Sequence, residues 1–129
     1  MAESASLTFS KRERIVSRKL IEQLFSKGSS QSTSAFPLRI VYMQTPREDI
    51  PVQILVSVSK RHFKHAVDRN RAKRQVREAY RHHKQLLMEN THDDKSLAIA
   101  FIWLSDTPCD SRQVDRSVRK LLEKVAASL

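Results

Sequence analysis

One stretch of the chain, His65 to Lys84, limits the fold most strongly because it contains neither glycine nor proline. Those two residues most often interrupt a helix, so the stretch predicts a helix. At about 100° per residue, six side chains, most of them apolar, fall on one side, which is expected to face a sheet. These residues are Ala72, Val76, Ala79, Tyr80, His83 and Leu87. An adjoining stripe, with Arg77 near its centre, consists of Asn70, Lys73, Arg74, Arg77, Arg81 and Lys84.

The positive charge of the chain is concentrated in two segments. Residues 60–84 contain ten Lys and Arg side chains against Asp68 and Glu78, and residues 11–27 contain six against Glu13 and Glu22. The remaining residues are slightly acidic, although the whole chain carries a net charge of +10. Like charges at helical spacing repel one another, so this distribution indicates a polyanionic partner and not a charged surface kept for solubility.

A first helix is predicted from the spacing of Leu20, Ile21, Leu24 and Phe25. Ser17 is the favoured N-cap, with residues 9–16 as an extended segment before it, and Gly28 is expected at the C′ position. Ser10 with Glu13 forms an alternative capping box. The last helix follows a cap at Asp110 or Ser111, and its expected buried residues are Val114, Val118, Leu121, Leu122 and Val125.

Three strands are predicted. In the first, the alternating residues Phe36, Leu38, Ile40 and Tyr42 form one face, after a short loop at 29–34. The turn-rich residues 46–51 should join it as a hairpin to the second strand, 52–59. The third strand, 96–104, is apolar on both faces and is therefore expected to be central. The order helix, strand, strand, helix, strand, helix predicts an α+β fold with a small sheet packed against helices.

Size and composition bound the remaining possibilities. A chain of 129 residues fits a single domain, with an ordered part expected at about 9–125. No apolar run is long enough to span a bilayer, and the N-terminus lacks the pattern of a secretory signal. A lone cysteine, Cys109, agrees with a reducing compartment. These features predict a cytoplasmic protein without a membrane partner.

No catalytic or metal-binding group is expected on the protein itself. Cleavage of a phosphodiester by side chains would need clustered carboxylates or a histidine pair. Asp93 and Asp94 lie in a polar loop, while His62 with His65, and His82 with His83, lack partner ligands at metal-binding spacing. A protein-only nuclease is therefore disfavoured, as is a helix-turn-helix DNA-binding protein, because a strand and not a helix precedes the basic helix.

The basic helix carries a recognisable pattern, Arg69-Asn70-Arg71-x-Lys73-Arg74-x-x-Arg77-Glu78-x-Tyr80-Arg81. It closely resembles the Arg-Asn-Arg signature of the bacterial ribonuclease P protein family. The preceding residues 56–61 are similar to the strand that leads into that signature, and the resemblance extends over nearly all of residues 9–125. A ribosomal or RNA-chaperone-like module would have similar charge without this strict order, and it remains the alternative.

The resemblance implies a mixed sheet with a left-handed βαβ crossover, and a subunit that assists a catalytic RNA in removing the 5′ leader of precursor tRNA. It also implies magnesium for the holoenzyme, no cofactor held by the protein and no DNA partner. The implied RNA-binding residues are Lys60, Arg61, Lys64, Arg69, Asn70, Arg71, Lys73, Arg74, Arg77 and Arg81. A cleft between the first helix and the sheet would bind the leader through Ile21, Phe25, Phe36, Tyr42, Ser57, Ser59, Lys60 and Arg61.

Two positions depart from the family pattern. Ile21 stands where an aromatic residue is usual, and Leu55 stands where a small residue is usual. Stacking on an aromatic ring contributes ~1–3 kcal/mol per base, and an aliphatic contact contributes less. Phe25 and Tyr42 remain equally compatible with ordinary core positions.

Overall fold

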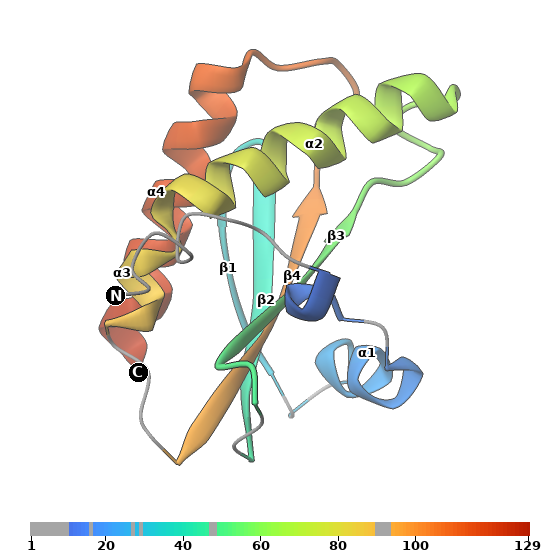
Figure 1. The fold of residues 1–129 in the computed structure, drawn as a ribbon. Helices are drawn as coiled ribbons and strands as arrows, with labels where there is room; N and C mark the ends of the chain where they lie inside the picture. The colour runs from blue at the N-terminus through green and yellow to red at the C-terminus, as the bar shows by residue number, and fades with distance from the viewer. Residues whose placement is uncertain (1–10, 16, 27, 29, 47–48, 90–93) are drawn as a thin grey trace.

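The computed structural model describes residues 11–15, 17–26, 28, 30–46, 49–89 and 94–129 (Figure 1). Its four strands are β1 (Gln31–Ala35), β2 (Leu38–Pro46), β3 (Val52–Ser57) and β4 (Lys95–Trp103). They form one sheet in the order β1-β2-β4-β3, in which β3 and β4 are parallel and the other pairs are antiparallel. The described helices are η2 (Lys11–Glu13), α1 (Arg18–Leu24), α2 (Ala66–His83), α3 (Gln85–Met88) and α4 (Ser111–Ser128). The predicted α+β fold with a mixed sheet is confirmed.

The predicted hairpin between the strands at 36–42 and 52–59 is wrong. β4 lies between β2 and β3, and it pairs with β2 from Leu38↔Trp103 to Pro46↔Lys95. The central position predicted for β4 is confirmed, because the strand is buried along almost its whole length. The chain passes from β3 to the parallel β4 through α2 and α3, while the left-handed sense of this crossover remains an expectation from the family.

The sequence predicts a loop at 29–34, whereas the structure has strand β1 at Gln31–Ala35. Its residues are small and polar, and most of them are exposed, so they show no apolar alternation. β1 forms instead by pairing with β2, from Gln31↔Tyr42 to Ala35↔Leu38. Phe36, which was predicted to begin the first strand, therefore lies in the turn between β1 and β2.

The two faces of the sheet carry different helices. α2 and α4 cover the face formed by Ile40, Ile54 and Ile99, where the larger hydrophobic core lies. A smaller core on the other face joins Leu24 of α1 to Val41, Ala98 and Ala100. Alternate residues of each strand point to opposite faces, so the register decides which side chains can share a surface.

Local capping agrees with the sequence at both predicted sites. Ser17 Oγ accepts a hydrogen bond from Leu20 N at 3.2 Å, and Asp110 Oδ1 accepts one from Gln113 N at 2.8 Å. Residues 11–13 form a 3-10 turn and not the expected extended segment, while the alternative cap Ser10 lies outside the described residues. Gly28 has φ 87°, but it lies beyond the helix C-cap Phe25 and not directly after it.

Candidate nucleic-acid interface

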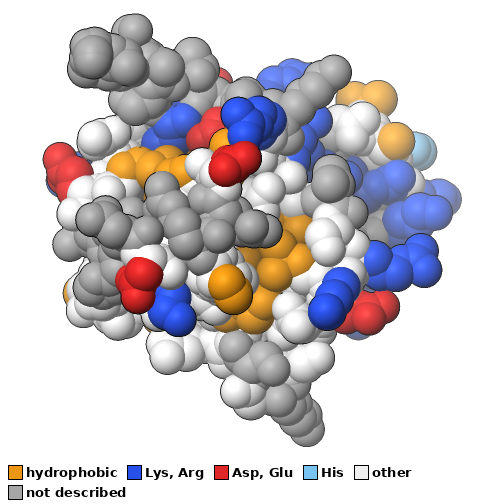
Figure 2. Space-filling model, turned by 60° about the horizontal axis from the view of Figure 1, so that its bottom comes forward, with side chains coloured by type: hydrophobic (Ala, Val, Ile, Leu, Met, Phe, Trp, Pro, Cys, Tyr) orange, Lys and Arg blue, Asp and Glu red, His pale blue; other side chains and the backbone are white. Residues whose placement is uncertain are grey.

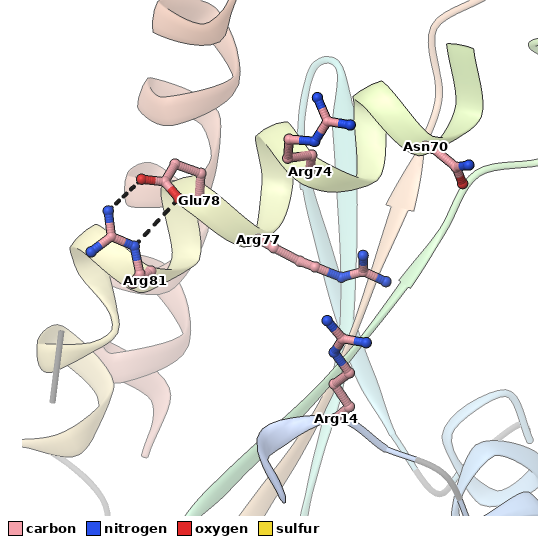
Figure 3. Close-up of a pocket in the computed structure, with 6 residues that line it drawn as sticks. All are labelled: Arg14, Asn70, Arg74, Arg77, Glu78 and Arg81. Atoms are coloured by element: carbon pink, nitrogen blue, oxygen red, sulfur yellow. Dashed lines mark hydrogen bonds and ion pairs between the residues drawn. The ribbon is translucent and has the colours of Figure 1, made fainter. Parts of the chain in front are cut away.

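The exposed side of α2 borders a shallow pocket at the surface of the molecule (Figure 3). Asn70, Arg74, Arg77, Glu78 and Arg81 line it from successive turns of the helix, as their sequence spacing predicts. Arg14 lines it from the opposite side, although it lies far away in sequence. Arg14 was not among the predicted site residues. The only signal for it was the positive charge of the segment at 11–27.

Like charges approach one another in this pocket. The guanidinium groups of Arg14 and Arg77 point toward each other in Figure 3. Partial burial, and secondly the nearby charge of Arg14, lower the pKa of Arg77. A site of this kind favours an anion, because a phosphate accepts paired hydrogen bonds from guanidinium groups and offsets their repulsion.

Glu78 neutralises one end of the predicted stripe. Arg81 donates hydrogen bonds to both carboxylate oxygens of Glu78 from the next turn of the helix. This contact lowers the pKa of Glu78 and raises that of Arg81. His82 Nε2 lies 3.5 Å from the same carboxylate. The positive charge is therefore greater toward Arg74 and Arg77 than toward Arg81.

Lys84 does not belong to the stripe, and its placement there was wrong. Its Nζ lies 2.8 Å from Glu13 Oε1, and the two side chains are 4% and 10% exposed. The prediction that His83 faces the sheet needs a related correction. Its Nε2 lies 2.9 Å from Asp115 Oδ2 on α4, so the ring joins two helices and is not part of the hydrophobic core against the sheet.

Arg69 shapes the loop that leads into α2. Its Nη1 donates hydrogen bonds to Phe63 O at 2.9 Å and to Lys64 O at 3.0 Å. The same loop is held by Ser59 Oγ, which accepts from Arg61 N at 3.0 Å, and by His62, whose Nδ1 lies 2.7 Å from Asp106 Oδ1. The loop is therefore fixed by several contacts, while its cations Lys60, Arg61 and Lys64 are exposed.

Two further residues of α2 that were predicted to bind RNA, Arg71 and Lys73, do not line the pocket beside Arg74 and Arg77. Arg71 borders a separate small hollow with Trp103 and Pro108, on the side of the helix nearer to the β4–α4 connection. Lys73 is half-buried. Asn70, Arg74, Arg77 and Arg81 are thus brought together, while Arg69 and Arg71 point elsewhere.

The predicted leader cleft is only partly assembled. Ser57 lies beside Ile102 in the register, Ile102 lies beside Arg39, and all three share the sheet face that α1 covers. Ile21 and Leu55 pack against the small core of that face, and Phe25 is 50% exposed. Arg39 was not predicted, although it alternates with the apolar residues of β2.

Tyr42 is wrongly placed in that cleft. It belongs to the core on the opposite face, and its hydroxyl lies 3.0 Å from both Gln31 Oε1 and Ser128 Oγ. Phe36 is exposed in the β1–β2 turn. It follows the C-terminal end of β1, whereas α1 precedes the N-terminal end of that strand. Tyr42 therefore does not share a cleft with Phe25, although the family resemblance implied that it would.

The face of the molecule in Figure 2 shows hydrophobic side chains at the surface, with many Lys and Arg side chains gathered to one side.

A hollow lies between α1 and the sheet, and none of the residues that line it was predicted to belong to the leader cleft. It is lined by Ser17, Lys19, Leu20, Gln23, Thr45, Pro46, Gln53, Ser96, Leu97 and Ala98.

Neither a metal site nor a membrane span can be recognised in the part of the chain that the structure describes. Within that part, no three His, Cys, Asp or Glu side chains are grouped so that they could hold an ion. No described helix is long and apolar enough to cross a bilayer.

Comparisons with known proteins agree with this arrangement. The family model described as ribonuclease P matches residues 9–126. The ribonuclease P protein component of Porphyromonas gingivalis (strain ATCC 33277) is 38% identical and covers 100% of this chain and 94% of its own length. A mutant ribonuclease P protein from Staphylococcus aureus has a TM-score of 0.68 at 22% identity, covering 91% of this chain and 90% of its own. The Thermotoga maritima protein has a TM-score of 0.67 at 20% identity, covering 88% and 97%. The chain therefore belongs to the ribonuclease P protein family.

Proposed function

We propose that the exposed basic side of α2 binds the catalytic RNA of ribonuclease P. The chain is the protein component of that enzyme, which matures the 5′ end of tRNA, and the RNA subunit performs the cleavage. The observation that carries the proposal is the convergence of Asn70, Arg74 and Arg77 on one open pocket. Guanidinium groups spaced along a helix suit the phosphates that border a groove of folded RNA.

The loop before α2 extends this surface. Lys60, Arg61 and Lys64 are exposed, while hydrogen bonds from Arg69 to the loop carbonyls hold their backbone. A fixed loop loses little conformational entropy on binding, so its cations contribute more of their interaction energy to affinity. We assign Arg69 mainly to this positioning role and the three exposed cations to RNA contact. Arg71 and Lys73 extend the surface at its margins.

Precursor tRNA is the second proposed partner. Its single-stranded 5′ leader would cross the α1 side of the sheet, past Phe25 and Ser57, toward Lys60 and Arg61. Such a strand binds where exposed rings stack on bases and cations follow the backbone. Phe25, at 50% exposure, is accessible for stacking, and the exposed Arg39 adds a cation on this face. Ile21 and Ser59 would border the path by apolar and polar contact.

The chain would act as one cytoplasmic RNA-binding domain, with magnesium serving the RNA of the holoenzyme. When bound, magnesium would stabilise the charge that develops on the reacting phosphate. The described residues offer cations and amides at the site and no cluster of carboxylates for that ion. A ribosomal or RNA-chaperone-like role is not favoured, because the family model covers nearly the whole chain.

Reconstitution tests the proposal. The purified protein is mixed with ribonuclease P RNA from the same organism, and cleavage of precursor tRNA is followed at low magnesium, with the RNA alone and the protein alone as controls. We expect faster cleavage with both components and none with the protein alone. A protein that neither binds the RNA nor changes the cleavage rate would contradict the proposed function.

A further inference from the structure

The segment at 11–15 is attached to the body of the protein by contacts to β3 and to the end of α2. Ile15 N donates to Ile54 O at 2.9 Å, which extends the outer edge of β3. Gln53 Nε2 donates to Arg12 O at 3.1 Å. Lys84 Nζ, beyond the end of α2, donates to Glu13 Oε1 at 2.8 Å. The segment therefore spans from the sheet edge to the helix that carries the basic side chains.

The Glu13–Lys84 contact is a buried ion pair. The Lys84 side chain is 4% exposed and the Glu13 side chain 10%. The fully buried Tyr80 lies near the pair, and the pKa of its hydroxyl is raised by burial and by the charge of Glu13. Removing one member of a buried ion pair leaves the other charge without compensation, so the pair strongly favours a single position of the segment.

Arg14 follows Glu13 directly, and its position is set by these attachments. Arg14 forms an isolated parallel bridge with Ile54, and its side chain extends across the pocket toward Arg77 (Figure 3). The two guanidinium groups come from elements that are distant in sequence, yet they border the same pocket with Arg74. Folding alone therefore brings like charges together, at an electrostatic cost that an anion would offset.

We propose that Arg14 and Arg77 form a preformed site for one phosphate of the RNA backbone, and that the Glu13–Lys84 pair positions Arg14 in it. This inference rests on the proposed function, the binding of ribonuclease P RNA by α2. Glu13 and Lys84 are positioning residues, because they are buried and act on the phosphate through Arg14. The site is formed before RNA arrives, so little ordering remains to be done on binding.

The first test compares two arginines of the segment at 11–15. Arg14→Gln and Arg12→Gln remove the same charge, but Arg12 is exposed and lies 3.7 Å from Asp49, away from the pocket. We expect Arg14→Gln to weaken binding of ribonuclease P RNA by about 10- to 100-fold, the range for lost charged hydrogen bonds. The slope of log affinity against log salt should become shallower by roughly 0.7–0.9. Arg12→Gln should change both quantities much less.

The second test compares two variants, Glu13→Gln and Glu78→Gln, that each remove one negative charge. Glu13→Gln makes the protein more positive, so long-range attraction alone would tighten RNA binding. The positioning role requires the opposite result, weaker binding, because Arg14 loses its fixed place. Glu78→Gln is the matched control, since it makes the same charge change in the pocket and should tighten binding. In an Arg14→Gln background, Glu13→Gln should no longer weaken binding, because its effect passes through Arg14.

Thermal unfolding accompanies each binding measurement. If Glu13→Gln does not fold, Glu13→Asp replaces it, because that change keeps the charge and shortens the side chain by one methylene. Weaker RNA binding is again expected. The inference is overturned if Arg14→Gln matches Arg12→Gln, or if the folded Glu13 variant binds RNA as tightly as the unchanged protein.

Arg74→Gln distinguishes a failure of the proposed phosphate site from a failure of the proposed α2 surface. If Arg74→Gln weakens RNA binding while Arg14→Gln does not, the phosphate site is wrong and the α2 surface stands. If neither change affects binding, the proposed α2 surface itself is wrong.

Discussion

The hydroxyl oxygens of Tyr42 and Ser128 lie 3.0 Å apart, so the middle of β2 is joined to the last turn of α4. The Tyr42 ring therefore packs on the face of the sheet opposite α1. Tyr42→Phe removes this contact and the one to Gln31, and should lower the free energy of unfolding by about 1–3 kcal/mol. Chemical denaturation measures that loss.

The same variant tests the placement of the leader. Binding of precursor tRNA by the reconstituted holoenzyme should be unchanged in Tyr42→Phe, because the hydroxyl and ring are buried away from α1. A selective loss of precursor affinity, with mature tRNA unaffected, would show that Tyr42 contacts the leader after all.

Arg69 offers a test of loop positioning. Arg69→Lys keeps the charge but cannot reproduce the planar guanidinium that donates to the carbonyls of Phe63 and Lys64. We expect faster amide hydrogen exchange in residues 59–64 and weaker RNA binding with an unchanged salt slope. Arg112→Lys is the control, because Arg112 is an exposed arginine of α4 that makes no contact with this loop. A shallower slope in Arg69→Lys would instead assign Arg69 to a direct phosphate contact.

Glu78 limits the charge of the basic surface. Its pKa is lowered, chiefly by the hydrogen bond from Arg81, so Glu78 stays ionised to a lower pH than an ordinary glutamate does. The Glu78–Arg81 ion pair contributes to stability above the unfolded-state pKa of Glu78. This contribution is lost only as pH falls through the lower folded-state pKa. At neutral pH, Glu78→Gln should tighten RNA binding and steepen the salt slope. Filter binding over a salt series measures both, and weaker binding would mean that Arg81 needs Glu78 for its position.

Lys60 and Arg61 test the path of the leader. Changing both to Ala should weaken binding of precursor tRNA by the preassembled holoenzyme more than binding of mature tRNA, which has no leader. The difference should be about 10- to 100-fold, by the size of charged hydrogen bonds. Equal weakening for the two ligands would leave this loop with the RNA subunit or the body of the tRNA alone, and would contradict its proposed contact with the leader.

Local patterns in the sequence predicted the elements better than their arrangement. Asp110 and Ser17 were identifiable as caps because a cap depends on neighbouring residues. The hairpin prediction was wrong because a short connection between β2 and β3 does not exclude a later strand, here β4, from pairing between them. The apolar character of both faces of β4 did point to that central place. The polar strand β1 gave no local signal, because its pairing with β2 determines it.

The sequence predicted which residues of α2 line the candidate site, but it did not predict which residues from other segments lie beside them. Helical periodicity correctly grouped Asn70, Arg74 and Arg77, since they share a helix. It misplaced Lys84, because a buried partner from a distant segment binds that side chain. For the same reason Arg14 could not be assigned to the pocket, as only tertiary contacts bring residues 11–15 against β3 and α2.

The most direct measurement of the central claim is the salt dependence of binding to ribonuclease P RNA. The double variant Arg74→Gln/Arg77→Gln is compared with Arg112→Gln/Arg116→Gln, which removes two exposed arginines from α4. If the basic side of α2 binds the RNA, the α2 variant should bind more weakly, with a slope shallower by roughly 1.4–1.8 for two lost phosphate contacts, and the α4 variant should stay close to the unchanged protein. Equal affinities and slopes for the two double variants would contradict the account.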